Sequence, residues 1–155
     1  MPLDELATSN VNRSYSLAGT SIAIFTFMLF FLYPRFASGQ VDARLFQATL
    51  ALMGVATFSF VFASFYYYCV SLGSPVDDSE RVRFSARGDC FWLLGYTLMF
   101  LGPSLILFSL GLLAVGATWF ALWLVYFGFL IRRFPMIRSV AKSPERAPSS
   151  AERAT

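Results

Sequence analysis

The sequence contains no histidine, and this absence argues against several kinds of site at once. Histidine is the side chain most often used as a general base, the commonest transition-metal ligand and the usual axial ligand of haem. Cys69 and Cys90 are the only cysteines, so neither a disulfide framework nor a four-cysteine zinc site can be built from them. The sequence therefore predicts no metal and no cofactor.

Charged side chains are also scarce, at 14% of the residues, whereas 57% are apolar and the mean hydropathy is +0.61. A soluble domain has about a quarter of its residues charged. So few charges cannot cover a water-facing surface, and lipid is the solvent that suits this composition. The net charge of +3 is modest, and its basic residues gather at the ends of apolar runs. That pattern is typical of membrane orientation, and no nucleic-acid partner is expected.

Three long uncharged runs predict four transmembrane helices. The first, from Tyr15 to Tyr33, has 19 residues, which match a hydrocarbon core of about 30 Å. The second covers residues 45–70. The third, residues 90–131, would reach about 63 Å as one helix and must fold back, with Gly111 and Gly116 as the expected hairpin. The expected fold is an all-α membrane protein, a four-helix transmembrane bundle with spans at about 15–33, 45–70, 91–110 and 114–131.

The distribution of Lys and Arg predicts the orientation. Ten of the 12 lie in the N-terminus, in the loop between the second and third spans, or in the C-terminal tail. The opposite side holds only Arg35 and Arg44. By the positive-inside rule both termini are cytoplasmic, in what we expect to be a bacterial or archaeal cytoplasmic membrane. Residues 1–14 form the cytoplasmic N-terminus and 15–138 the transmembrane domain. The tail, 139–155, is rich in Ser, Pro, Ala and charge, and we expect it to be disordered.

Each span carries a face of small or hydroxyl side chains, which is the usual means of close helix packing in lipid. The third span repeats such residues at a spacing of seven, which keeps them on one side of a helix pair. The faces are Ser16, Gly19, Ala23 and Thr26; Gln47, Gly54, Thr57, Val61, Ser64 and Tyr68; Gly88, Gly95, Gly102 and Ser109; and Ala114, Ala117, Ala121 and Gly128. We favour packing, and the alternative is that the second of these faces lines a polar path.

No span contains Asp, Glu, Lys, Arg or His. Ionisable residues inside the membrane mark proton relays and voltage sensors, so both of those classes are disfavoured. Pro103 lacks an N–H group, and we expect it to release the carbonyl of Met99 and kink the third span. Broken helices can form binding sites, but a proline in a membrane helix is more often only a kink.

The loop before the third span holds three arginines, Arg81, Arg83 and Arg87. They could bind anionic lipid headgroups or an acidic surface of a partner. The alternative is a solvated helix that extends the third span, supported by charge pairs at helical spacing.

Together these features predict a non-enzymatic multi-pass membrane protein that acts by helix packing. It would be a subunit or assembly factor of a membrane complex with other membrane subunits, or a homo-oligomer. An oligomeric channel or passive conduit lined by the second span is the first alternative, since uncharged side chains can line a pore. The second alternative is a membrane-embedded enzyme, whose catalytic groups would have to be the loop carboxylates Asp77, Asp78, Glu80 and Asp89.

Overall fold

The computed structural model describes the backbone of residues 3–72 and 78–142, and the side chains of residues 5–72 and 80–132. These ranges contain four helices and no strand: α1 (Leu3–Ala37), α2 (Ala43–Ser71), α3 (Asp78–Ser109) and α4 (Leu113–Lys142). Each helix is long and apolar enough to cross a membrane. The predicted all-α fold with four such helices is confirmed.

The helices are longer than the predicted spans. α1 has 35 residues, or about 52 Å, because no glycine or proline interrupts residues 3–14 and the helix persists into its polar flank. α4 continues past Ile131 to Lys142, so the first four residues of the tail that we expected to be disordered, 139–142, are helical. The rest of that tail lies outside the described residues.

Glycines in the left-handed conformation end α1 and α3. Gly39 has a φ of 75° and Gly111 a φ of 76°, values that only glycine adopts without strain. At the end of α3 the N–H of Gly111 donates to the carbonyl of Phe108 (3.0 Å), and that of Leu112 donates to Leu107 (2.9 Å). These two hydrogen bonds form a Schellman motif, which satisfies carbonyl groups that the end of the helix would otherwise leave without a donor.

The expected hairpin at Gly111 and Gly116 is therefore only half right. Gly111 makes the turn, whereas Gly116 lies within α4. A Cβ atom at Gly116 would come within 2.9 Å of the Phe108 ring, so glycine is needed there for close approach of α4 to α3. One left-handed residue is enough to reverse the chain, and the second glycine serves packing.

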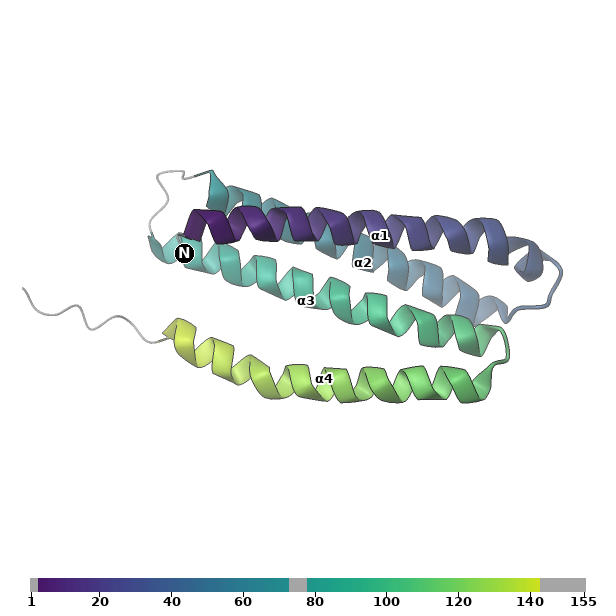
Figure 1. Ribbon diagram of the computed structural model, residues 1–155. Helices are drawn as coiled ribbons and strands as arrows, with labels where there is room; N and C mark the ends of the chain where they lie inside the picture. Colours follow the sequence, from purple (N-terminus) through teal and green to yellow (C-terminus); the bar gives the residue numbers. More distant parts are fainter. Residues whose placement is uncertain (1–2, 73–77, 143–155) are drawn as a thin grey trace, which may run out of the picture.

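α2 is the central helix of the bundle. It packs along α1 on one side and along α3 on the other, while α1 and α3 barely touch. Among the described residues α4 contacts α3 and neither α1 nor α2, and Figure 1 shows it on the side of α3 that faces away from α1. The described bundle is thus open, because a closed four-helix bundle would bring α4 back against α1.

The apolar core lies near the α1–α2 turn. Met28, Val41, Phe46 and Met53 are each at most 6% exposed, and Ile106 of α3 packs against them. The turn itself is tied to the end of α3, since the N–H of Asp42 donates to the carbonyl of Ser109 (3.2 Å). The carboxylate of Asp42 also caps α2 by accepting the N–H of Leu45 (2.9 Å).

Candidate functional site

The glycine face of α3 packs against α2. A Cβ atom at Gly95 would lie 3.1 Å from the carbonyl oxygen of Ala56 and 3.0 Å from the Phe60 ring. At Gly102 the nearest atom would be the sulfur of Met53, at 3.1 Å. Side chains at these two positions would hold the helices apart, so the seven-residue repeat lies where α3 approaches α2 closely.

Two predicted residues flank this contact. Ser109 is buried, and its hydroxyl donates to the carbonyl of Ile106 (2.7 Å). Pro103 is half-buried, and α3 runs without interruption from Asp78 to Ser109 across it. Proline is thus accommodated within one helix, and no break opens a binding site there.

The predicted polar face of α2 is divided between different surroundings. Gln47 is exposed, and nothing lies within 4 Å of a Cβ atom built at Gly54. The Thr57 hydroxyl donates a hydrogen bond to the Ser21 hydroxyl of α1 (3.0 Å). The buried Ser64 hydroxyl donates to the carbonyl of Phe60 (3.0 Å). Of these groups, the Thr57 hydroxyl makes a hydrogen bond to another helix, and the hydroxyl of Ser64 bonds within α2.

The small-residue faces predicted for α1 and α4 lie on the surface of the chain, and of their residues Ser16 also borders an opening between α1 and α3. All eight of their residues are exposed: Ser16, Gly19, Ala23, Thr26, Ala114, Ala117, Ala121 and Gly128. The face by which α1 meets the bundle is a different one, formed by Ala7, Ser14, Ala18, Ser21 and Met28. The expectation that all four faces assemble one bundle is wrong for these two, because α1 carries small residues on more than one side.

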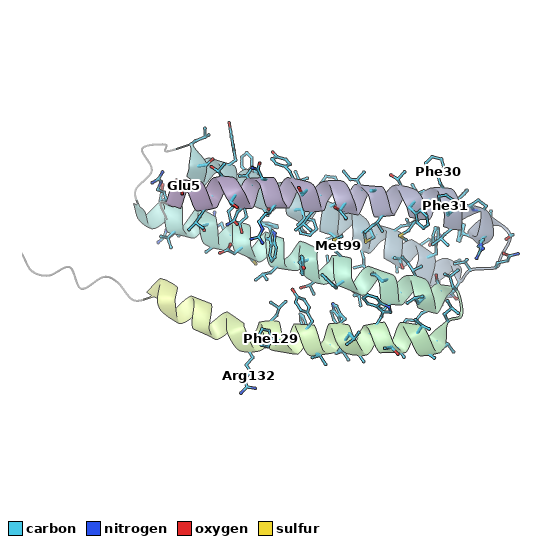
Figure 2. The ribbon with its side chains drawn as sticks, viewed as in Figure 1. Glu5, Phe30, Phe31, Met99, Phe129 and Arg132 are labelled. Carbon is cyan, nitrogen blue, oxygen red and sulfur yellow. The ribbon has the colours of Figure 1, made fainter. Side chains whose placement is uncertain are left out.

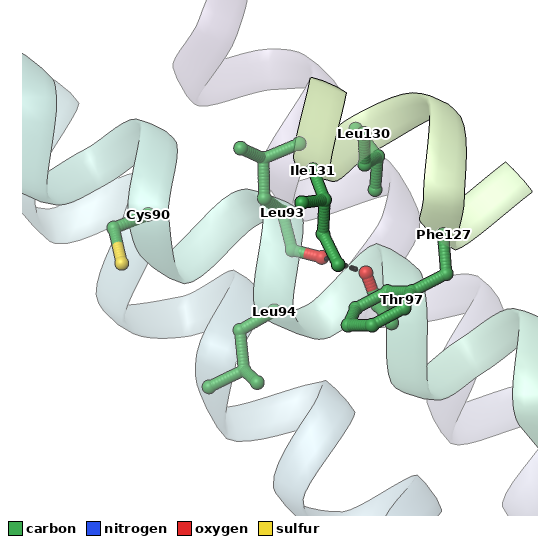
Figure 3. A pocket seen from close by; sticks show the side chains of 7 residues that line it. All are labelled: Cys90, Leu93, Leu94, Thr97, Phe127, Leu130 and Ile131. Atoms are coloured by element: carbon green, nitrogen blue, oxygen red, sulfur yellow. Dashed lines mark hydrogen bonds between the residues drawn. The ribbon is translucent and has the colours of Figure 1, made fainter. Parts of the chain in front are cut away.

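The interface between α4 and α3 is less extensive than those of α2 with α1 and with α3. The indole N–H of Trp123 donates to the main-chain carbonyl of Thr97 (3.0 Å), and Gly116 admits the Phe108 ring. A pocket of about 360 Å³ opens between the two helices (Figure 3), lined almost wholly by apolar groups: Cys90, Leu93, Leu94, Thr97, Phe127, Leu130 and Ile131. Only 6% of the α4 span is buried, and Figure 2 shows Arg132 pointing outward from it.

A tyrosine one turn before the end of α2 is hydrogen-bonded to a carboxylate about three turns into α3. Tyr67 is 3% exposed, and its ring lies against Gly88, where a Cβ atom would come within 2.9 Å. Its hydroxyl donates to the Asp89 carboxylate (2.5 Å). This pair was not predicted from the sequence. The only signal was the glycine beside Asp89, which leaves room for a ring.

The three loop arginines have different surroundings. Arg81 donates to the main-chain carbonyl of Val70 (3.4 Å), one of the carbonyls that the end of α2 leaves unsatisfied. Arg83 and Arg87 are exposed. Arg81 therefore helps to close α2, which is a structural role that the headgroup hypothesis did not include.

Of the four carboxylates on which an enzyme would depend, the structure describes the side chains of Glu80 and Asp89. Glu80 and Asp89 are both exposed, and Asp89 accepts the hydroxyl of Tyr67. Asp77 and the side chain of Asp78 lie outside the described residues. No protein-family model matches the chain, and no curated protein and no solved structure is similar to it. The proposed function therefore rests on the fold and on its exposed helix faces.

Proposed function

We propose that this chain is a non-enzymatic integral membrane protein that works through helix contacts within the bilayer. It acts as a subunit or assembly factor of a larger membrane complex, or as a homo-oligomer. One observation carries the proposal: the small-residue faces of α1 and α4 are exposed in the single chain, and α4 contacts α3 alone.

Small side chains are not needed on a surface that only meets lipid tails. They allow two backbones to approach closely, which is how helices associate where water cannot drive them together. At Gly19 and Gly128 a Cβ atom would meet nothing within 4 Å, so neither glycine is required by the fold of one chain. Close contact with a helix of another chain would explain why both positions are glycine.

The connections between helices leave little other surface for recognition. Residues 38–42 join α1 to α2, residues 72–77 join α2 to α3, and residues 110–112 join α3 to α4. Segments this short cannot bury a core of their own. A partner would therefore meet the chain mainly along its apolar helices.

Leucine substitutions test this proposal without disturbing the single chain. We expect Gly19→Leu and Gly128→Leu, purified in mild detergent, to weaken association about tenfold, which corresponds to about 1.4 kcal/mol. Native mass spectrometry measures the assembled mass. The matched control is Val115→Leu, at a residue of α4 that is 48% exposed and is not spaced by three, four or seven from any residue of the small-residue face. A wild-type chain that is monomeric and co-purifies with no partner would contradict the proposal.

We further propose that the chain lies in a bacterial or archaeal cytoplasmic membrane with both termini in the cytoplasm. The ten-to-two distribution of Lys and Arg supports this orientation. A fluorescent protein fused to the C-terminus should be bright, and alkaline phosphatase fused at the same place should be inactive. Active phosphatase there would reverse the orientation.

An oligomeric conduit is the second candidate, and the observation in its favour is that Thr57 and Ser21 bring two hydroxyls together between α1 and α2. Flux of ions and small solutes through proteoliposomes separates it from the first proposal. Thr57→Leu should lower the flux if the hydroxyls line a path. The absence of any flux would leave helix association as the function.

A further inference from the structure

A second pocket, of about 450 Å³, lies between α1 and α3. It exists because both helices pack on α2 and barely touch each other. Three of its residues are polar and three are apolar or aromatic: Asn12, Arg13, Ser16, Leu17, Trp92 and Tyr96. Its volume falls within the range of small-molecule sites, about 300–1,000 Å³.

The pocket lies where the polar flanks meet the apolar spans. Arg13 comes two residues before the uncharged run that starts at Tyr15. Trp92 follows Asp89, the last charge before the third span, by three residues. The ends of α1 and α3 that carry these residues lie at the same end of the bundle (Figure 1). In a bilayer this depth is that of the phosphate and glycerol groups of phospholipids.

The polar side of the pocket can hold an anion. Arg13 is exposed, and among the side chains that the structure describes it forms no ion pair. A guanidinium presents five N–H donors in a fork that matches a phosphate, and the Asn12 amide adds two more. Glu5 is eight residues before Arg13 on the same helix, more than two turns away.

The apolar side continues as a ladder of aromatic rings down α3. The Trp92 and Tyr96 rings stack with centroids 4.9 Å apart, and those of Tyr96 and Phe100 are 4.8 Å apart. Tyr126 of α4 closes the ladder, with its ring 6.0 Å from Tyr96 and 5.7 Å from Phe100. From Trp92 to Phe100 the ladder runs about 12 Å into the apolar region, parallel to the direction of an acyl chain.

We propose that this pocket binds one anionic phospholipid. Arg13 and Asn12 hold the phosphate, the pocket accepts the glycerol region, and an acyl chain lies along the ladder of Trp92, Tyr96 and Phe100. The site is distinct from the loop arginines, to which the sequence had assigned headgroup contact, and from the exposed association faces of α4. A soluble anion lacks the acyl chain, and in zwitterionic phosphatidylcholine the trimethylammonium group offsets the attraction of the phosphate for Arg13.

Native mass spectrometry of the purified full-length chain tests the site with three probes: phosphatidylglycerol, phosphatidylcholine of the same chain length, and inorganic phosphate. We expect one phosphatidylglycerol to bind five- to tenfold more tightly than phosphatidylcholine, and phosphate neither to bind nor to compete. Arg13→Gln should remove that preference. The control is Arg83→Gln, at an exposed arginine outside the pocket, which should keep it.

A second variant tests the apolar side. Trp92→Ala should lower the affinity for both lipids by a similar factor, because it shortens the ladder of aromatic rings and leaves the charge of Arg13 in place. Equal affinity for the two lipids in the wild-type chain would overturn the proposal. So would an Arg83→Gln variant that loses the preference as fully as Arg13→Gln. Competition by inorganic phosphate would overturn the lipid assignment and leave an anion site. Circular dichroism of each variant shows whether it keeps the wild-type helix content.

Discussion

The close contact of α2 and α3 predicts a measurable cost for the smallest substitution, Gly95→Ala. The added Cβ would lie 3.1 Å from the main-chain oxygen of Ala56, which cannot move without shifting α2. It would also lie 3.0 Å from the ring of Phe60, which is fully buried and has no space to swing into. Overpacking of this kind costs about 1–3 kcal/mol.

Replacing glycine by alanine also stabilises a helix by up to about 1 kcal/mol, which offsets part of that cost. Gly54→Ala on α2 isolates the steric term, because nothing lies within 4 Å of a Cβ atom there. The difference in the free energy of unfolding between the two variants should be about 1–3 kcal/mol. Gly102→Ala should cost less than Gly95→Ala, since the neighbouring Met53 sulfur is the flexible end of a side chain.

Reversible unfolding in mixed micelles with increasing dodecyl sulfate measures these free energies, with helix content followed by circular dichroism. The expected order of stability is Gly54→Ala above Gly102→Ala above Gly95→Ala. If Gly95→Ala proved as stable as Gly54→Ala, α2 and α3 would not meet along this glycine face, and the arrangement of the bundle would be refuted.

Three further substitutions have expected effects in the same assay. Tyr67→Phe removes the hydrogen bond to Asp89 and should destabilise the chain by about 1 kcal/mol, with no loss of ring packing. Ser14→Ala should be neutral or stabilising by about 1 kcal/mol, because the buried Ser14 hydroxyl has no partner among the described residues. Trp123→Phe removes the indole bond to the carbonyl of Thr97 and should destabilise the packing of α4 by about 1 kcal/mol.

Hydropathy and spacing were sufficient to predict the four helices and the turn at Gly111. The glycine repeat of α3 was also informative, because a spacing of seven with three glycines leaves only one side for close approach. The helix ends were harder to predict. α1 extends to Leu3 through a polar segment without glycine or proline, and hydropathy detects only its apolar part.

Which face of α1 and which face of α4 pack against the rest of the chain could not be predicted from the sequence. In lipid the outer surface of a bundle is as apolar as its interior, so hydrophobic periodicity does not show which side is buried. α1 has small residues on two faces, one with Ala18 and Ser21 and the other with Gly19 and Ala23. The pocket at Arg13 joins residues 12–17 to residues 92–96 and depends on both helices packing on α2.

The central claim is that the exposed small-residue faces of α1 and α4 contact another chain, and cross-linking in native membranes tests it most directly. Gly19→Cys and Gly128→Cys are introduced one at a time in a chain whose Cys69 and Cys90 are replaced by serine. Under a membrane-permeant oxidant or a short bifunctional reagent, we predict products heavier than one chain for both, and none for Val115→Cys, which lies on another exposed face of α4. If neither Gly19→Cys nor Gly128→Cys forms a heavier product, the faces meet only lipid and the account is contradicted.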